Sequence, residues 1–339
     1  MPAPGLVNPP SVAWHPSGNY ALVLNATNSV HRYDPVTHSL TSVGTTANNV
    51  TWRAITFSPD GSKAVLLGNV SSPVEGRVYV WDDATSQLTQ MSTVTFAGGT
   101  YEGIEWSHDG ATARLLGSKP NAGSYIAYLW KFDLTTGTSD LKAQATSAGC
   151  QDLGWATDAF GGPAVAVTCG VNGVSLFHLD ASGFFQNYSM NAGNTSRIAA
   201  RPQGDYALAI GWSGQRIYRF ELGNWSTGFS NPTFPGIFQV AFSTDGARAL
   251  VLGGYGGNPP VGQIYEFRDD LFQQADITDV SIPNFSLAPY NAISQDRLND
   301  AAFRPGCDGG LIVGGSSTFS GSKAYVIRFS VDNGTACPN

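Results

Sequence analysis

The stretch FSPDGSKAVLLG, from Phe57 to Gly68, decides the fold because its pattern recurs along the chain. Each copy has a short apolar strand that usually contains an aromatic residue, a polar turn ending in glycine, and a second apolar strand. Copies begin at Val12, Ile55, Ile104, Leu153, Ile198, Val240 and Ala301, spaced 42 to 61 residues apart. That spacing is near the roughly 40 to 50 residues of a four-stranded propeller blade. The pattern therefore predicts a repeat protein.

Each copy continues into a third strand that ends in an aromatic or aliphatic residue and is often followed by an acid, as in VHRYD at Val30 and VYVWDD at Val78. A weaker fourth strand follows in most copies, for example SQLTQMS from Ser86. One such sheet cannot bury both of its faces alone, but sheets stacked around an axis cover one another. We therefore expect an all-β fold, a seven-bladed β-propeller of four-stranded antiparallel blades, with residues 1–339 forming a single domain.

Composition agrees with this class. The 339 residues include 40 glycines and 19 prolines spread along the chain, and only 13% are charged. The formal net charge of -7 comes without a stripe of Lys and Arg, so we expect no nucleic acid partner. No apolar run approaches the roughly 20 residues of a membrane-spanning helix, so we expect no membrane insertion. MPAPGLVNPP lacks the regions of a signal peptide. We also expect a monomer.

The turn SPDG after an aromatic residue, with its apolar follow-on strand, resembles the repeats of TolB-type propellers. The WDD from Trp81 to Asp83 is similar to the end of a WD repeat. The resemblance covers nearly the whole chain, but its motifs specify blades and imply no particular function. Two copies depart from it, because Ala200 replaces the aromatic residue and the fourth copy carries the insertion DAFGGP. The likeness is therefore to the superfamily.

The turn itself has a structural explanation. Pro59 fixes φ at the first turn position, Asp60 can bond the backbone ahead, and Gly61 adopts the positive φ that a Cβ would penalise. The aspartates Asp60, Asp109 and Asp245 recur in several copies. Recurrence in several blades indicates a role in folding, so we do not assign these carboxylates to catalysis.

Four cysteines, Cys150, Cys169, Cys307 and Cys337, lack the spacing of a zinc site. An even count favours disulfides and an oxidising compartment, and buried free thiols are the alternative. With strands A to D numbered from the axis outward, Cys150 and Cys169 fall on the face that carries the D-to-A and B-to-C connections. Cys307 and Cys337 fall on the opposite face. We predict these two sequential pairs as disulfides, the second holding the last blade shut, in a secreted or periplasmic protein.

The face that carries the D-to-A and B-to-C connections is here named the mouth face, and the opposite one the corner face. Side chains just before each strand A converge on the channel at the mouth face. They include Trp52, Arg53, Tyr101, Glu102, Asp152, Arg197, Phe238, Gln239 and Asp300. Mixed charges rimmed by aromatic residues are typical of a ligand- or partner-binding site. The alternative is that the charges pair with one another and plug the axis.

Metal binding is a further alternative at the same place. The three channel carboxylates, Glu102, Asp152 and Asp300, could hold Ca²⁺. Otherwise we expect no cofactor.

Two B-to-C loops are unusual, NVSSPVEG from Asn69 and GGYGGNPPVG from Gly253, which presents Tyr255. Glycine- and proline-rich loops on a rigid scaffold often carry recognition. The long linker from Asp276 to Arg297 should lie over the mouth face as well, where Phe285 and Tyr290 would contact a partner. Glycosylation sequons beginning at Asn25 and Asn69, among others, would carry glycans in a eukaryotic secreted protein.

Local enzyme signatures such as HExxH, Gly-x-Ser-x-Gly and GxxxxGK[ST] do not occur in the sequence. We therefore predict a non-catalytic propeller that binds a protein or a small polar ligand through the mouth face. One alternative is a lectin-like propeller that binds carbohydrate on Trp52, Tyr101, Trp212 and Tyr255. Another is a hydrolase or lyase in which Glu102 and Asp152 act as acid and base.

Overall fold

The computed structural model of the protein describes residues 10–26, 28–46, 49–106, 112–122, 124–147, 150–157, 163–169, 174–179, 185–189, 195–203, 206–211, 216–221, 224–230, 237–253, 261–268, 271–273, 297–318, 321–330 and 337. Side chains of residues 142–196 and 209–238 lie outside this description. In the part of the chain that is described, no helix is long and apolar enough to cross a membrane.

The described strands form antiparallel sheets, each made of strands consecutive in the chain. The first sheet contains β1 (Val12–Trp14), β2 (Ala21–Leu24), β3 (Ser29–Asp34) and β4 (Ser39–Thr45). The second contains β5 (Val50–Phe57), β6 (Lys63–Ser71), β7 (Val74–Asp82) and β8 (Gln87–Ala97). The third contains β9 (Thr100–Trp106), β10 (Ala113–Asn121), β11 (Ser124–Asp133) and β12 (Thr138–Ser147).

The remaining sheets follow the same order. The fourth contains β13 (Cys150–Thr157), β14 (Pro163–Cys169), β15 (Val174–Leu179) and β16 (Phe185–Ser189). The fifth contains β17 (Thr195–Ala200), β18 (Tyr206–Gly211), β19 (Arg216–Glu221) and β20 (Asn224–Ser230). The sixth contains β21 (Ile237–Phe242), β22 (Arg248–Gly253), β23 (Val261–Arg268) and β24 (Leu271–Gln273). The seventh has three described strands, β25 (Arg297–Phe303), β26 (Gly309–Thr318) and β27 (Gly321–Ser330).

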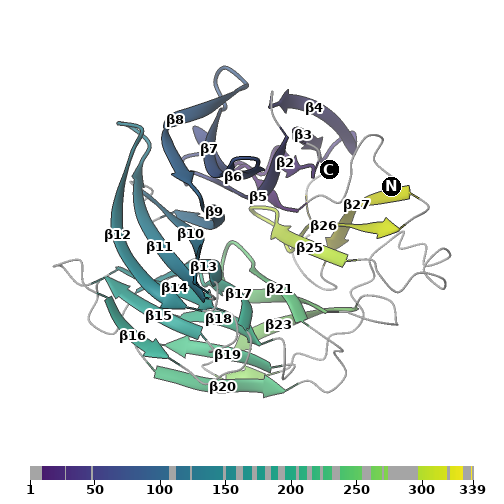
Figure 1. The fold of residues 1–339 in the computed structure, drawn as a ribbon. Helices are drawn as coiled ribbons and strands as arrows, with labels where there is room; N and C mark the ends of the chain where they lie inside the picture. The colour runs from purple at the N-terminus through teal and green to yellow at the C-terminus, as the bar shows by residue number, and fades with distance from the viewer. Residues whose placement is uncertain are drawn as a thin grey trace.

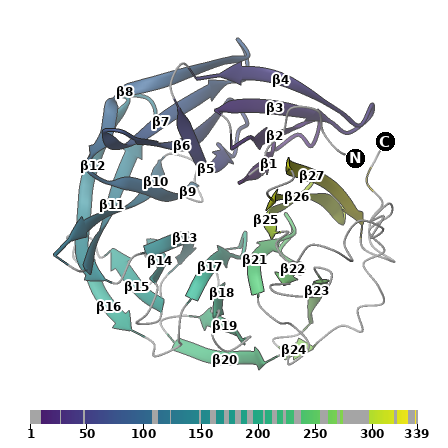
Figure 2. The same cartoon turned by 45° about the vertical axis from the view of Figure 1, so that its right-hand side comes forward.

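These sheets surround a central axis (Figures 1 and 2). Figure 2 shows the first strand of each sheet innermost and the last strand outermost. The innermost strands β1, β5, β9, β13, β17, β21 and β25 each contact the next one, and β25 contacts β1. The predicted all-β propeller fold is therefore confirmed. Each residue at which a sequence copy begins lies in the first strand of a sheet. A fourth strand of the last sheet would fall outside the described residues.

Apolar side chains fill the spaces between neighbouring sheets. In β6, Ala64 and Leu66 belong to the cluster shared with the first sheet, and Val65 and Leu67 to the cluster shared with the third. All four are 0% exposed. Because both faces of the strand are covered, its sequence is a continuous apolar run instead of an alternating one. Each fully buried Val or Leu side chain of this kind contributes roughly 1.5–3 kcal/mol of transfer free energy.

The turn that ends the first strand is a hydrogen-bonded corner. In the second sheet, Asp60 Oδ1 accepts hydrogen bonds from Ser58 Oγ at 2.6 Å and from the Ser62 amide at 3.0 Å. In the sixth sheet, Asp245 Oδ1 accepts the equivalent bonds from Ser243 Oγ at 2.6 Å and from the Ala247 amide at 2.9 Å. These bonds lower the pKa of Asp60 below its usual range. Both carboxylates thus hold a turn together, as expected, while Asp109 lies outside the described residues.

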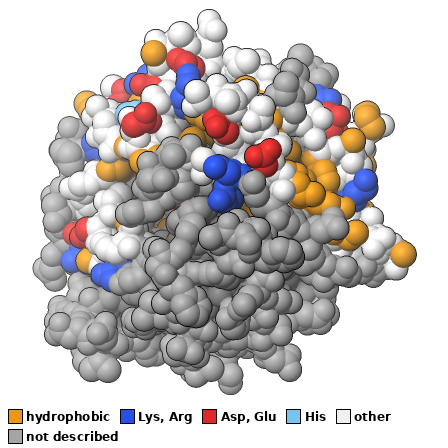
Figure 3. Space-filling model, turned by 90° about the vertical axis from the view of Figure 1, so that its left-hand side faces the viewer, with side chains coloured by type: hydrophobic (Ala, Val, Ile, Leu, Met, Phe, Trp, Pro, Cys, Tyr) orange, Lys and Arg blue, Asp and Glu red, His pale blue; other side chains and the backbone are white. Residues whose placement is uncertain are grey.

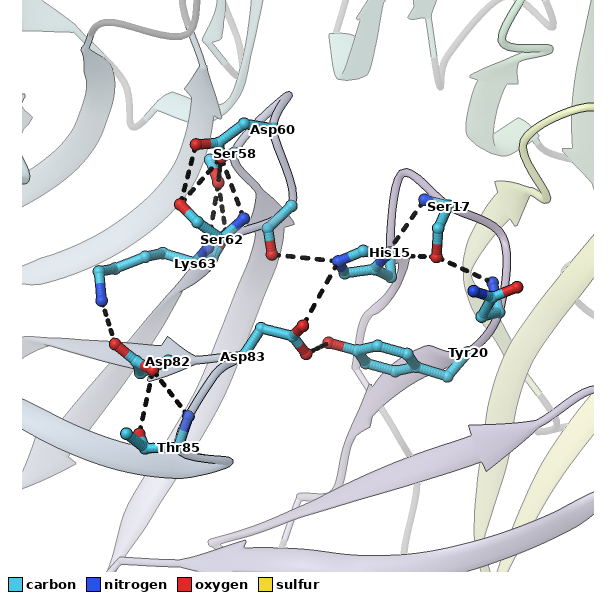
Figure 4. A network of polar contacts seen from close by, with 12 residues as sticks. His15, Ser17, Tyr20, Ser58, Asp60, Ser62, Lys63, Asp82, Asp83 and Thr85 are labelled. Carbon is cyan, nitrogen blue, oxygen red and sulfur yellow. Dashed lines mark hydrogen bonds and ion pairs between the residues drawn. The ribbon is translucent and has the colours of Figure 1, made fainter.

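Ser58 and Ser243 occupy the motif position directly after the first strand, and in other sheets this position holds His15 or Arg201. The basic side chain then donates to a carbonyl of the next sheet (Figure 4). His15 Nδ1 accepts the Ser17 amide, so Nε2 carries the proton and donates to the Gly61 carbonyl at 3.1 Å. Arg201 Nε donates to the Gly246 carbonyl at 2.9 Å in the same way. These bonds end on carbonyls of glycines with φ of +74° and +64°. One motif position thus provides either a local corner or a link between sheets.

The acid that follows the third strand also builds a turn. Asp34 Oδ1 accepts the amides of Val36 and Thr37 at 2.7 and 3.1 Å. Asp133 Oδ1 accepts those of Thr135 and Thr136 at 2.8 and 3.1 Å. In both turns a residue with positive φ comes next, at His38 and Gly137. The recurrent acids are therefore Asx-type turn formers between the third and fourth strands.

Cysteine positions agree with the predicted pairing as far as they are described. Cys307 and Cys337 form a disulfide with a Cα–Cα distance of 4.8 Å. Cys150 and Cys169 are Cα partners across β13 and β14, although their side chains lie outside the described residues. The second predicted disulfide is thus confirmed, and the first stays a prediction.

Candidate recognition surface at the channel mouth

A β-bulge marks the same position in six of the innermost strands. In each of these strands, the Cα register with the neighbouring strand skips one residue, two places before the start of the sequence motif. These residues are Arg53, Glu102, Gln151, Ser196, Phe238 and Asn299. Bulges re-aim side chains and occur preferentially at rims and next to functional sites. The residue type at this position differs from sheet to sheet, while the backbone irregularity recurs.

Arg53 and Glu102 form an ion pair between the second and third sheets at this bulge position. Arg53 Nε lies 3.9 Å from Glu102 Oε2, with the arginine side chain 49% exposed and the glutamate 16% exposed. Glu102 Oε1 also accepts hydrogen bonds from Thr100 Oγ1 at 2.5 Å and from Ser118 Oγ at 3.2 Å. The glutamate is therefore fixed from its own sheet, and the half-exposed guanidinium projects outward from it.

Asp300 takes a different role, because its carboxylate joins three sheets. It accepts hydrogen bonds from Ser11 Oγ at 2.7 Å and from the Val12 amide at 3.0 Å, both at the start of the first sheet. It also accepts the Ala301 amide at 2.8 Å and the side-chain amide of Gln239 from the sixth sheet.

Burial raises the pKa of Asp300, while the bonds from Ser11 and Val12 and the charge of Arg197 act to lower it. Four donors around one carboxylate describe a structural clamp. For Asp300, Gln239 and Arg197, the structure thus agrees with the alternative in which mouth residues pair with one another.

The expectation that Trp52 and Tyr101 rim the mouth is wrong, because each is only 1% exposed. In these two sheets, the residue before the bulge faces the space between sheets. Trp52 lies opposite Gly68 on β6 and packs edge-on against Tyr79, with ring centroids 5.0 Å apart. Tyr101 lies opposite Gly117 and packs against Trp130 at 5.5 Å. Trp52 and Tyr101 were expected to be exposed because they directly precede Arg53 and Glu102. Alternation of side chains across the bulge instead places the aromatic pair and the charged pair on different sides of the strand.

The segment NVSSPVEG is not a long flexible loop, contrary to expectation. β6 runs to Ser71 and β7 begins at Val74, so two residues connect the strands. The Asn69 side chain explains the extension, because its Nδ2 donates to the Tyr101 carbonyl at 2.9 Å and its Oδ1 accepts the Tyr101 amide at 2.8 Å. Asn69 and Asn25 are 7% and 1% exposed, so neither side chain is available for a glycan.

Hairpins of the second and third sheets extend at the mouth end. The β6–β7 hairpin carries Val74, which is 44% exposed, and the β10–β11 hairpin carries Tyr125, which is 42% exposed. Both are large hydrophobic residues, and both lie in the sheets that provide Arg53 and Glu102. Exposed apolar side chains beside a charged pair are a common composition of binding surfaces.

Other predicted site residues are only partly described. Asp152 lies in β13 and Phe238 in β21, with side chains outside the described residues. Tyr255, Phe285, Tyr290 and Trp212 lie outside the described residues altogether. Among the residues that are described, no group of three His, Cys, Asp or Glu side chains is placed to hold a metal ion.

Sequence reasoning missed three polar residues of this region, Asn69, Thr100 and Ser118. Asn69 carries a signal, since it follows a fully buried strand as Asn25 does after β2. Thr100 and Ser118 carry none, because only the register of β9 with β10 brings them to Glu102. Charges of both signs are interspersed with polar atoms on the side of the molecule in Figure 3.

Comparison with known proteins supports the fold. No protein-family model and no curated protein matches the sequence. Among solved structures, the chain is similar to a chain in the crystal structure of a mitotic checkpoint complex. The two share 15% sequence identity with a TM-score of 0.62, over 98% of this chain and 90% of the other. At that identity the likeness shows the fold alone, a β-propeller; the WD-repeat and TolB-type resemblances stay predictions.

Proposed function

We propose that the chain is a non-catalytic scaffold, a seven-bladed propeller over residues 1–339 that binds a protein partner through its mouth face. The observation that carries the proposal is that a backbone bulge recurs at one position in six of the innermost strands, where Arg53 of the second sheet is 49% exposed and pairs with Glu102 of the third. A partner would contact Arg53 and the exposed Val74 and Tyr125 of the neighbouring hairpins.

A folded protein surface suits this site better than a sugar. Carbohydrate sites use exposed aromatic rings as platforms, and the two described rings assigned that role, Trp52 and Tyr101, are buried between sheets. The surface instead offers an exposed cation and separated apolar side chains, which fit the mixed chemistry of protein interfaces.

Catalysis by channel carboxylates has less support for a related reason. Asp300 is surrounded by four hydrogen-bond donors, and Glu102 is held by two hydroxyl groups and Arg53. An acid/base residue needs room for substrate within hydrogen-bonding reach. Both carboxylates already bond groups of the protein.

The same proposal places the protein outside the cytoplasm, as a secreted or periplasmic scaffold. The disulfide between Cys307 and Cys337 supports this, since such bonds persist in oxidising compartments.

Affinity capture from the source organism tests the function. The bait is the wild-type chain, and the variants reverse one charge at each face, Arg53→Glu at the mouth and Lys63→Glu at the corner. Each basic residue forms an ion pair in the wild type, with Glu102 and Asp82 respectively, so the variants are matched. We expect one recurrent protein whose recovery falls at least tenfold with Arg53→Glu and is unchanged with Lys63→Glu. Equal recovery with both variants would refute recognition at the mouth.

A further inference from the structure

The first and last sheets are neighbours around the axis but lie at opposite ends of the described chain. We call the contact between these two sheets the seam. In the described residues, each of these sheets is built from its own consecutive strands, and no strand of one pairs with the other. Every other pair of neighbouring sheets is joined by the chain itself. Among the described residues, side-chain and backbone contacts join the two sheets at this seam.

Contacts at this seam extend from the middle of β25 to the corner. At the middle of the strand, Ser11 Oγ and the Val12 amide donate to Asp300. Closer to the corner, Trp14 Nε1 donates to the Ala302 carbonyl at 3.1 Å. At the corner end, Arg304 Nε donates to the Gly18 carbonyl at 2.8 Å. Leu311 and Val313 of β26 complete an apolar cluster with β1 and β2.

The disulfide is attached to the corner that makes the last of these polar contacts. Cys307 lies in the turn between β25 and β26, and its amide donates to the Arg304 carbonyl at 3.4 Å. The Arg304 amide in turn donates to the Gly309 carbonyl at 2.7 Å, closing the turn. Cys337 comes after β27, the last described strand of the sheet. The disulfide thus joins Cys337, after β27, to the turn from which Arg304 contacts the first sheet.

We propose that the Cys307–Cys337 disulfide is a redox-sensitive latch on ring closure: when it is oxidised the seam is held, and when it is reduced the seam opens locally. The disulfide joins two cysteines 30 residues apart, and a covalent loop of that length restricts the conformations open to the chain. Reduction removes that restriction from the seventh sheet alone. The other sheets keep their backbone connections to both neighbours.

Reduction proceeds by thiol–disulfide exchange with a dithiol. Cys307 is 6% exposed, whereas Cys337 is partly exposed, so the thiolate of the dithiol attacks Cys337 Sγ. Cys307 leaves as a thiolate and takes up a proton. The second thiol of the reagent then displaces Cys337, which also becomes a thiol, and the reagent becomes a cyclic disulfide. Two electrons and two protons pass from the reagent to the protein.

Hydrogen exchange measured by mass spectrometry, with and without dithiothreitol, tests the latch. The background is the full chain with Cys150→Ser and Cys169→Ser, so only one cysteine pair responds to the reagent. We expect exchange at the Val12, Arg304 and Cys307 amides to rise about tenfold or more on reduction. The Gly61 and Gly246 amides occupy equivalent turns of the second and sixth sheets and should not change.

A second comparison avoids the reagent. The variant with Cys307→Ser and Cys337→Ser, in an otherwise wild-type chain, should show the same raised exchange at the seam without dithiothreitol. No change at the three seam amides, or an equal rise in all sheets, would overturn the proposal. If the background with Cys150→Ser and Cys169→Ser does not fold, the same measurement on the wild type and on the variant with Cys307→Ser and Cys337→Ser decides whether the disulfide holds the seam.

Discussion

Single residues in this protein differ in function according to where they sit around the innermost strand. Arg53 in the second sheet and Asp300 in the seventh occupy neighbouring positions of the repeated motif. The Arg53 side chain is half exposed, whereas the Asp300 carboxylate accepts hydrogen bonds from three sheets. The difference comes from their neighbours. Asp300 lies at the seam, where the first sheet presents Ser11 and the Val12 amide, while Arg53 meets a glutamate already held by hydroxyl groups.

Replacing the carboxylate of Asp300 tests its role as a clamp. Asp300→Asn keeps the size but substitutes a donor where all four partners donate, so at least one partly buried donor loses its acceptor. We expect a loss of about 2 kcal/mol in the free energy of unfolding, measured by urea denaturation. Asp60→Asn is the control at an exposed turn and should have a smaller effect. Equal effects would contradict the clamp.

The same pair of proteins should also differ with pH. Because burial raises the pKa of Asp300, the folded state binds this proton more tightly than the unfolded chain does. Its contribution to stability therefore decreases as pH rises through the interval above about 3.9. The stability difference between wild type and Asp300→Asn should be larger at pH 4 than at pH 7. Urea denaturation at both values checks this, and a difference independent of pH would exclude titration of Asp300.

His31 should give the opposite dependence. Its side chain is buried and its Nε2 lies 3.1 Å from Ser29 Oγ, and burial lowers its pKa below 6.5. The unfolded chain then binds the proton more tightly, so stability is lost as pH falls below 6.5. We expect wild type to lose more stability between pH 7 and pH 5 than His31→Gln does, in thermal denaturation. Equal losses would show that His31 does not contribute.

Whole elements explain which parts of the site the sequence could predict. Apolar and turn patterns repeat in every copy, so the strands and corners were predictable from FSPDGSKAVLLG and its relatives. The bulges repeat in structure but not in residue type, and they decide that Arg53 faces outward while Trp52 faces inward. No sequence pattern marks a bulge whose residues differ in each sheet. The hairpin of β6 and β7 was missed because the hydrogen bonds that support it join Asn69 of β6 to Tyr101 on the next sheet.

Glycine at position 68 tests how β5 packs on β6. A Cβ on Gly68 would clash with Val50 Cγ1 and lie 3.2 Å from Trp52 Cε3, so Gly68→Ala forces Val50 to move and presses on the tryptophan. We expect a loss of about 1–3 kcal/mol by denaturant unfolding, as for other overpacked cores. Gly44→Ala places its Cβ 3.3 Å from Leu88 Cβ near the sheet edge and should be nearly neutral. Similar losses in both would mean that Trp52 is not tightly packed.

At the scale of the whole molecule, ring closure was only partly predictable. The pairing of Cys307 with Cys337 followed from counting along the chain. The seam did not, because Ser11, Trp14 and Arg304 contact partners almost 290 residues away in sequence. Those contacts depend on how the stacked sheets come around the axis, which no local pattern encodes. The recognition face that we propose opposite the corner turns depends on that closed arrangement.

Lysine cross-linking of the complex with its captured partner tests the central claim most directly. Lys119 lies on the β10–β11 hairpin at the mouth end, and Lys63 lies at the corner where β6 begins. Cross-linked peptides identified by mass spectrometry report which of the two lysines lies near the partner. Recognition through the mouth face predicts cross-links from Lys119 and none from Lys63. Cross-links from Lys63 alone would contradict the account.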